Sequence, residues 1–114
     1  MGGLGPWGEG KAAAYLESHG YRIVERNYRC RAGEIDLVAR RGDILVFVEV
    51  KTRCSLQCGW PAESVTLAKQ HHIRRTALWY VAERCPDTED LRLDVIEILV
   101  SGGRAYLRHT ENAF

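Results

Sequence analysis

The spacing of apolar and polar residues along the chain predicts two helices and five strands. The first helix is expected from Gly5 to about His19, and Gly20 follows it in the usual C-terminal position. The second helix is expected from Thr66, a suitable N-cap, to about Arg84. The strands are expected at residues 21–28, 34–40, 44–51, 91–100 and 104–109. This order, α-β-β-β-α-β-β, predicts an α/β fold with a mixed central β-sheet flanked by helices.

The second and third strands are joined by Gly42-Asp43, a pair that favours a tight hairpin turn. With this turn, Asp36 is predicted opposite Glu49, and Glu34 opposite Lys51. Because side chains alternate between the faces of a strand, all four groups are expected on one face of the sheet. A loop of three residues would disperse them. The third strand is apolar on both sides, which predicts a central position covered by helices.

Two carboxylates opposed on a largely buried face, Asp36 and Glu49, repel each other and require compensation. Hard carboxylate oxygens on rigid strands suit Mg²⁺ or Mn²⁺ and leave positions for water and phosphate. Lys51, two residues beyond Glu49, could orient a water or stabilise the charge of a phosphorane. Glu9 could supply another oxygen if the first helix crosses this face. An ion-pair network, with Glu34 on Lys51 and an arginine on Asp36, is the alternative that the residues leave open.

Several short motifs carry a resemblance to a known family. Gly33-Glu34-Ile35-Asp36, followed after twelve residues by Glu49-Val50-Lys51, looks like the signature of the PD-(D/E)xK nuclease superfamily. The whole chain resembles the bacterial YraN-like family, whose fold is similar to that of archaeal Holliday junction resolvases. The other matching stretches are Gly8-Glu9, Gly20-Tyr21, Arg26-Asn27-Tyr28, Phe47 to Arg53, Val65-Thr66, Lys69 and Leu93-Asp94-Val95.

This resemblance implies a restriction-endonuclease-like core in which Glu9, Asp36 and Glu49 bind Mg²⁺ or Mn²⁺ and catalyse cleavage together with Lys51. It implies a metal-dependent endonuclease that hydrolyses phosphodiester bonds in branched or structured DNA. A homodimer would supply the two cuts that resolution requires. A catalytically silent nucleic-acid-binding module with the same fold is the second hypothesis. A purely structural or partner-binding protein is the third.

The net charge is only +1, but residues 22–75 carry +5 and residues 76–114 carry −3. This asymmetry predicts one face suited to an anionic polymer, although two ordinary solvated surfaces would give the same pattern. Lys69, His72 and Arg75 in the second helix, together with Arg53, are candidates for contacts with DNA phosphates. Lys69 stands in the first helical turn, where a lysine is unfavourable to the helix dipole, so a role in binding is favoured.

The length of 114 residues predicts a single domain spanning residues 1–114. No apolar stretch is long enough to cross a membrane, and the N-terminus lacks the pattern of a signal peptide. A cytoplasmic protein is therefore expected, with its four cysteines as free thiols. Zinc on Cys54 and Cys58 is the less favoured alternative, because no second matching pair follows.

Four other residues have roles that the sequence suggests. Trp7 and Trp79 are expected to be packing residues, and Asp94 is expected to be structural. Trp60, in the loop after Lys51, could stack on a base, although a core position is favoured.

Overall fold

The computed structural model describes residues 4–54 and 66–114, in which the predicted element order is confirmed. The elements are α1 (Leu4–Ser18), β1 (Arg22–Cys30), β2 (Gly33–Arg41), β3 (Ile44–Arg53), α2 (Leu67–Arg84), β4 (Asp90–Ser101) and β5 (Arg104–Thr110). The strands form one sheet in the order β1-β2-β3-β4-β5, in which β3 and β4 are parallel and the other neighbours are antiparallel. The predicted mixed sheet is therefore confirmed. Neither helix is long and apolar enough to span a membrane.

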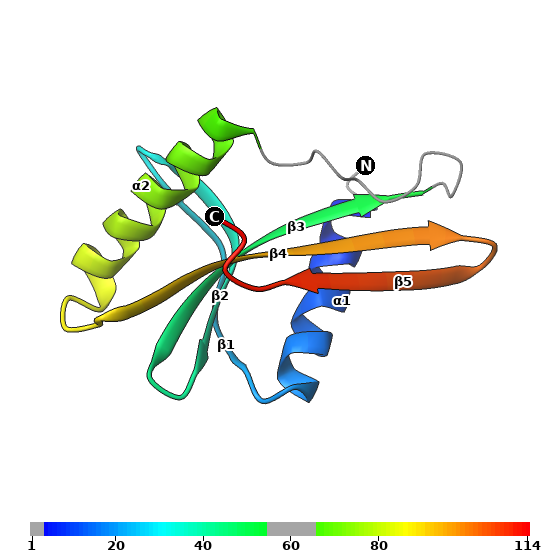
Figure 1. Ribbon diagram of the computed structural model, residues 1–114, viewed down its shortest axis with the longest axis horizontal. Helices are drawn as coiled ribbons and strands as arrows, with labels where there is room; N and C mark the ends of the chain where they lie inside the picture. The colour runs from blue at the N-terminus through cyan, green and yellow to red at the C-terminus, as the bar shows by residue number, and fades with distance from the viewer. Residues whose placement is uncertain (1–3, 55–65) are drawn as a thin grey trace.

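The two helices cover opposite faces of the sheet at different positions along it (Figure 1). One core cluster lies under α1 and includes Ala12, Ala13, Leu16, Leu37, Val46, Val48 and Ile96. The other lies under α2 and includes Ile35, Val38, Leu45, Phe47, Ile73, Ala77 and Tyr80. Successive residues of β3 thus enter opposite clusters, which explains why this strand is apolar on both sides. The prediction that β3 is central is confirmed.

The end of α1 and the start of α2 lie where the sequence predicts. Gly20 has φ +89°, a conformation that glycine adopts without strain, and the N–H of Tyr21 donates to the Leu16 carbonyl at 3.0 Å. At the start of α2, the Thr66 hydroxyl accepts the N–H of Lys69 at 3.2 Å. The N-cap therefore holds the backbone of Lys69 in place.

The hairpin of β2 and β3 has the predicted register, since Arg41 pairs with Ile44 and Leu37 with Val48. The ladder ends there, one step before Asp36 and Glu49. Asp36 and Glu49 thus lie where the predicted register continues, but they are not themselves a paired step of the ladder. At this point the Asp36 carboxylate accepts the N–H of Val50 at 2.8 Å.

The hairpin of β1 and β2 changes direction at Asp36. Ile35 packs under α2 whereas Leu37 packs under α1, although residues two apart on a regular strand share a face. On β1, the residue opposite Asp36 is Asn27, whose φ of +52° lies in the left-handed region that asparagine tolerates. The pairing of β2 with β3 ends just before Asp36, so the outer part of the β1–β2 hairpin separates from β3 at this residue.

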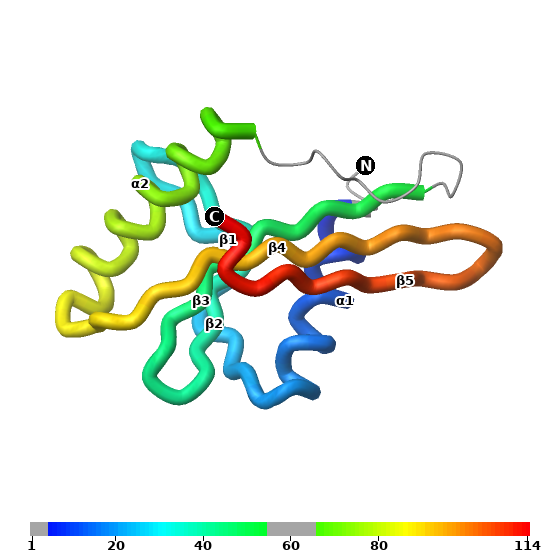
Figure 2. The backbone as a smooth tube through the Cα atoms, viewed as in Figure 1, coloured from blue at the N-terminus to red at the C-terminus, as the bar shows by residue number. Residues whose placement is uncertain are grey.

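The far end of this hairpin lies beside the first half of α2 (Figure 2). A Cβ added at Gly33 would lie 2.9 Å from the hydroxyl of Thr76 on α2. The turn between β1 and β2 thus approaches α2 closely because a glycine stands there.

Cys30, Cys54 and Cys85 are free thiols, as expected. Cys58 and Trp60 lie outside the described residues, and so does the alternative of zinc on Cys54 and Cys58. Trp7 and Trp79, expected as packing residues, lie outside the core, with 37% and 45% of their surface exposed. Trp79 follows the exposed Leu78 on the outer side of α2, while the next residue, Tyr80, is buried.

Candidate metal and nucleic-acid site

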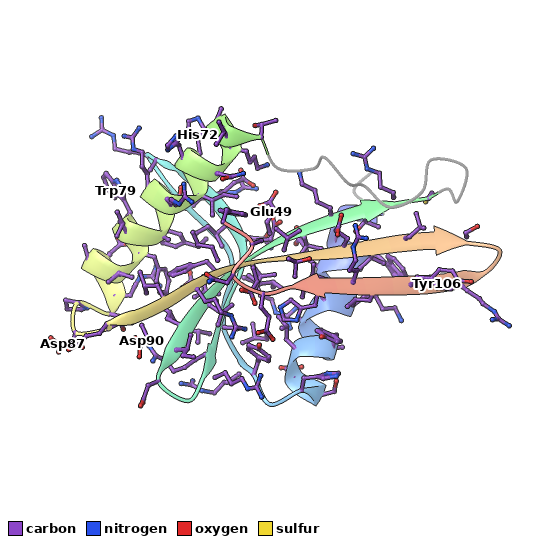
Figure 3. All side chains as sticks on the ribbon, viewed as in Figure 1. Glu49, His72, Trp79, Asp87, Asp90 and Tyr106 are labelled. Carbon is purple, nitrogen blue, oxygen red and sulfur yellow. The ribbon has the colours of Figure 1, made fainter. Side chains whose placement is uncertain are left out.

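Glu49 is the centre of the candidate site. Its side chain is 7% exposed, and one carboxylate oxygen, Oε2, lies 3.3 Å from Lys51 Nζ and 3.1 Å from Lys69 Nζ. Lys51 comes from the same strand as Glu49, which Figure 3 labels, whereas Lys69 comes from the first turn of α2. A buried carboxylate is costly without partners, and two ammonium groups from two elements compensate for this one.

Asp36 lies beside this group in an unfavourable electrostatic environment. Burial, together with the charges of Glu49 and Glu9, raises the pKa of its carboxyl from the ordinary 3.8 to about 7. The N–H of Val50 and the charge of Lys69 act in the opposite direction but do not offset these effects. At neutral pH, Asp36 is therefore poised between its neutral and its charged form.

Glu9 follows a residue of α1 that lies very close to β3. A Cβ at the preceding residue, Gly8, would lie 2.0 Å from the Thr52 hydroxyl, so a glycine is needed for this approach. Glu9 itself is half-buried, and its charge contributes to the raised pKa of Asp36. Gly8 therefore places Glu9 within electrostatic range of Asp36.

The chemistry of the donor set fits a hard divalent cation. The charges of Glu49 and Glu9 raise the pKa of Asp36, and Mg²⁺ or Mn²⁺ beside these carboxylates would relieve that repulsion. Across residues 4–54 and 66–114, however, no three His, Cys, Asp or Glu side chains gather closely enough to hold a metal ion. Asp36 and Glu49 are thus the candidate ligand pair, and Glu9 would have to move to join them.

The other predicted residues are distributed around this cluster. Arg53, His72 and Arg75 are exposed, while Lys69 is drawn into the site by its contact with Glu49. Glu34, expected on the same face as Asp36, instead lies 3.9 Å from Arg29 at the surface. Its placement follows from the bend at Asp36, which turns the outer part of the hairpin away from β3.

Two features of the site were missed by sequence reasoning. The contact of Lys69 with Glu49 joins residues on different elements, and the only signal for it was a lysine in the first turn of a helix. The bend at Asn27 had a weaker signal, an asparagine inside a strand pattern. Both features determine how the carboxylates are arranged.

The comparisons with known proteins cover the whole candidate site. A family model described as "Uncharacterised protein family UPF0102" matches residues 8–98. A UPF0102 protein of Geobacter metallireducens is 50% identical over 111 residues, which cover 97% of this chain and 91% of the relative. A UPF0102 protein of Syntrophotalea carbinolica is 48% identical over 111 residues, covering 97% and 90%. One of Beutenbergia cavernae is 47% identical over 107 residues, covering 93% and 91%.

Proposed function

The chain belongs to the uncharacterised protein family UPF0102, whose description carries no activity, and we propose a function from the site itself. The proposed function is that of a divalent-metal-dependent endonuclease, which hydrolyses phosphodiester bonds in branched or structured DNA. The observation that supports this most is the buried Glu49, which meets two lysines beside the half-protonated Asp36 where β2 and β3 diverge. A carboxyl with a pKa near 7 beside a buried carboxylate and two lysines is typical of functional sites, which favours this proposal over an ion-pair network that serves stability alone.

The roles of the residues follow from their positions. Asp36 and Glu49 would hold Mg²⁺ or Mn²⁺, with Glu9 as a further ligand after a small movement of α1 or of its own side chain. The bound ion would supply Lewis acidity and lower the pKa of a water molecule. Lys51 lies on the rigid strand β3 next to Glu49, where its ammonium can stabilise the negative charge that develops on the phosphate.

The nucleic acid would contact the exposed cations around the site. Arg53 extends from the end of β3, and His72 and Arg75 lie on the first half of α2. Such contacts hold the backbone in position without reading its sequence, which suits a substrate recognised by shape. A homodimer would present two sites, and thus two cuts, to a branched substrate.

The test compares the wild-type protein with Glu49→Gln on four DNA substrates: a four-way junction, a flap, a single strand and a linear duplex. We expect the wild type to cut the junction or the flap in magnesium or manganese, and the variant to cut none of them. Binding of the variant, measured by gel shift in calcium, should be intact or slightly tighter, because a negative charge facing phosphate is removed. No cleavage by the wild type on any substrate would overturn the proposal.

A catalytically silent nucleic-acid-binding module is the second candidate. It is favoured by the two lysines that already neutralise Glu49. It is also favoured by the lack, among the described residues, of three carboxylate, imidazole or thiol groups close enough to hold a metal ion. Its signature in the same experiment is binding of structured DNA without cleavage in either metal. Absence of binding even at low salt would leave only a structural role.

A further inference from the structure

Lysine is rare in this chain, and two of its three lysines form ion pairs with the same oxygen atom. The lysines are Lys11, Lys51 and Lys69. Both Lys51 and Lys69 contact Oε2 of Glu49, a carboxylate that is almost fully buried. In the metal-free protein, this oxygen is therefore already occupied by cations.

The same oxygen cannot serve two lysines and a metal ion together. Glu49 is the buried member of the proposed ligand pair, and a divalent cation beside it would repel the nearby ammonium groups. Binding of the metal and contact with both lysines thus exclude each other at this atom. A metal ion that binds Oε2 therefore displaces one lysine.

Lys69 is the one that can leave. Its side chain is 45% exposed, compared with 24% for Lys51, and it reaches Glu49 from another element. Its backbone is held by the Thr66 cap, so only the flexible side chain needs to move. Moreover, an ammonium group in the first turn of a helix is disfavoured by the helix dipole, which lowers the cost of its departure.

We propose that Lys69 is an exchangeable counter-ion: it neutralises Glu49 in the metal-free protein, moves away when a divalent ion binds there, and then contacts a phosphate of the nucleic acid. This inference rests on the proposed function and deepens it, since it couples the two ligands of one site. Without metal, the Lys69 charge is used within the protein. With metal, that charge becomes available to the substrate.

Coupling of this kind is reciprocal by thermodynamic necessity. If metal binding frees Lys69 for phosphate, then nucleic acid that holds Lys69 must strengthen metal binding by the same factor. The free protein would therefore bind metal weakly and bind it more tightly on DNA. A lysine that merely stabilised the fold would give no such coupling.

The direct test observes the lysines themselves. Protein labelled with ¹³C at the lysine Cε position gives signals from three residues, which the spectra of Lys69→Met and Lys11→Met assign. Titration with Mg²⁺, without DNA, should shift the Lys69 signal until it saturates and leave Lys11 unchanged. An unchanged Lys69 signal, while calorimetry detects binding of Mg²⁺, would overturn the proposal.

The second test measures affinity. Calorimetric titration of Lys69→Met with Mn²⁺ should give binding about two- to fivefold tighter than wild type, because a competing and partly exposed ion pair is lost. Lys69→Arg, which keeps the charge, should remain near wild type, and Lys11→Met serves as the matched control. In wild type, junction DNA should tighten Mn²⁺ binding, and in Lys69→Met most of this gain should vanish.

The outcomes separate this inference from the proposed function. If wild type binds Mn²⁺ and cleaves DNA while Lys69→Met binds Mn²⁺ no more tightly, the exchange is wrong and the nuclease proposal stands. If wild type binds neither Mn²⁺ nor DNA, both proposals fail. Circular dichroism of each variant shows whether it is folded. If Lys69→Met is not folded, Lys69→Arg assigns the Lys69 signal, and the lysine spectra of wild type decide the matter.

Discussion

Asp94 and Asp36 are both carboxylates withdrawn from solvent, yet the protein treats them in opposite ways. Asp94 is fully buried and accepts hydrogen bonds from Arg92, from the backbone N–H of Asn112 and, at 2.7 Å, from His109. Burial alone would raise the pKa of Asp94, but these donors hold it below its ordinary value. Asp36 has one backbone donor and two neighbouring carboxylates, and its pKa rises to about 7.

The Asp94 cluster joins segments that are far apart in the chain. His109 on β5 contacts Asp94 through Nε2, and its Nδ1 lies 3.1 Å from the hydroxyl of Tyr15 on α1. Arg92 also donates to Tyr21, just before β1. These contacts hold both ends of the chain onto the sheet and support the expectation that Asp94 is structural.

The difference between the clusters shows in the direction of their pH dependence. Asp94 has a lowered pKa in the folded protein, so its stabilising contribution is present above about pH 4 and is lost as the pH falls further. Asp36 has a raised pKa, so the folded state binds its proton more tightly, and stability falls as the pH rises from 3.8 to about 7. A saturated polar cluster stabilises the fold, whereas an unsaturated one is destabilising until a ligand arrives.

The largest effect is expected from Asp94→Ala. The substitution leaves Arg92 and His109 without their buried acceptor, and the free energy of unfolding should fall by about 3–5 kcal/mol. Urea denaturation measures it, with Asp90→Ala, at an exposed position on the same strand, as the control. A loss no larger than in the control would show that the cluster is not structural.

At high pH, Asp36→Asn should instead raise the free energy of unfolding. The amide keeps an acceptor for the Val50 N–H and removes the charge, so at about pH 8 the variant should be more stable than metal-free wild type by about 2 kcal/mol. The rise of the pKa from 3.8 to about 7 sets an upper limit of about 4 kcal/mol. The advantage should shrink as the pH is lowered toward 4, in urea denaturation with EDTA present. An advantage independent of pH would contradict the raised pKa.

Gly8→Ala should cost about 1 kcal/mol, because its Cβ would meet the Thr52 hydroxyl and the strain exceeds the gain in helix propensity. Gly10→Ala is the matched control: nothing lies within 4 Å of its Cβ, and it should stabilise α1 by up to about 1 kcal/mol. Thermal unfolding of both variants measures the difference. Cleavage should fall only in Gly8→Ala, because α1 carries Glu9; equal cleavage in both would separate Glu9 from catalysis.

The smallest effect is expected from Tyr15→Phe, which removes one hydrogen bond from the Asp94 cluster. The loss of its contact with His109 should lower the free energy of unfolding by about 0.5–1 kcal/mol and leave cleavage unchanged. Tyr106→Phe, at a position that is 40% exposed on β5, should change neither quantity. Reduced cleavage in Tyr15→Phe at unchanged stability would place this cluster in the function as well.

The sequence by itself determined the elements and the hairpin register, because these depend on neighbours close along the chain. Gly20 ends α1, Thr66 caps α2, and the two-residue turn at Gly42 sets the pairing of β2 and β3. That register alone placed Asp36 and Glu49 at the same end of two adjacent strands. The candidate pair was therefore predictable without coordinates.

Only the tertiary structure decided how these groups are compensated. The bend at Asn27 lets the outer hairpin pack under α2, and only then does Lys69 reach Glu49. Asp94 likewise gains its partner His109 when β5 pairs with β4, and Tyr15 meets the same histidine 94 residues away. The distant segments that pack around a buried carboxylate decide whether its neighbours are hydrogen-bond donors or other carboxylates. A local sequence pattern does not specify this.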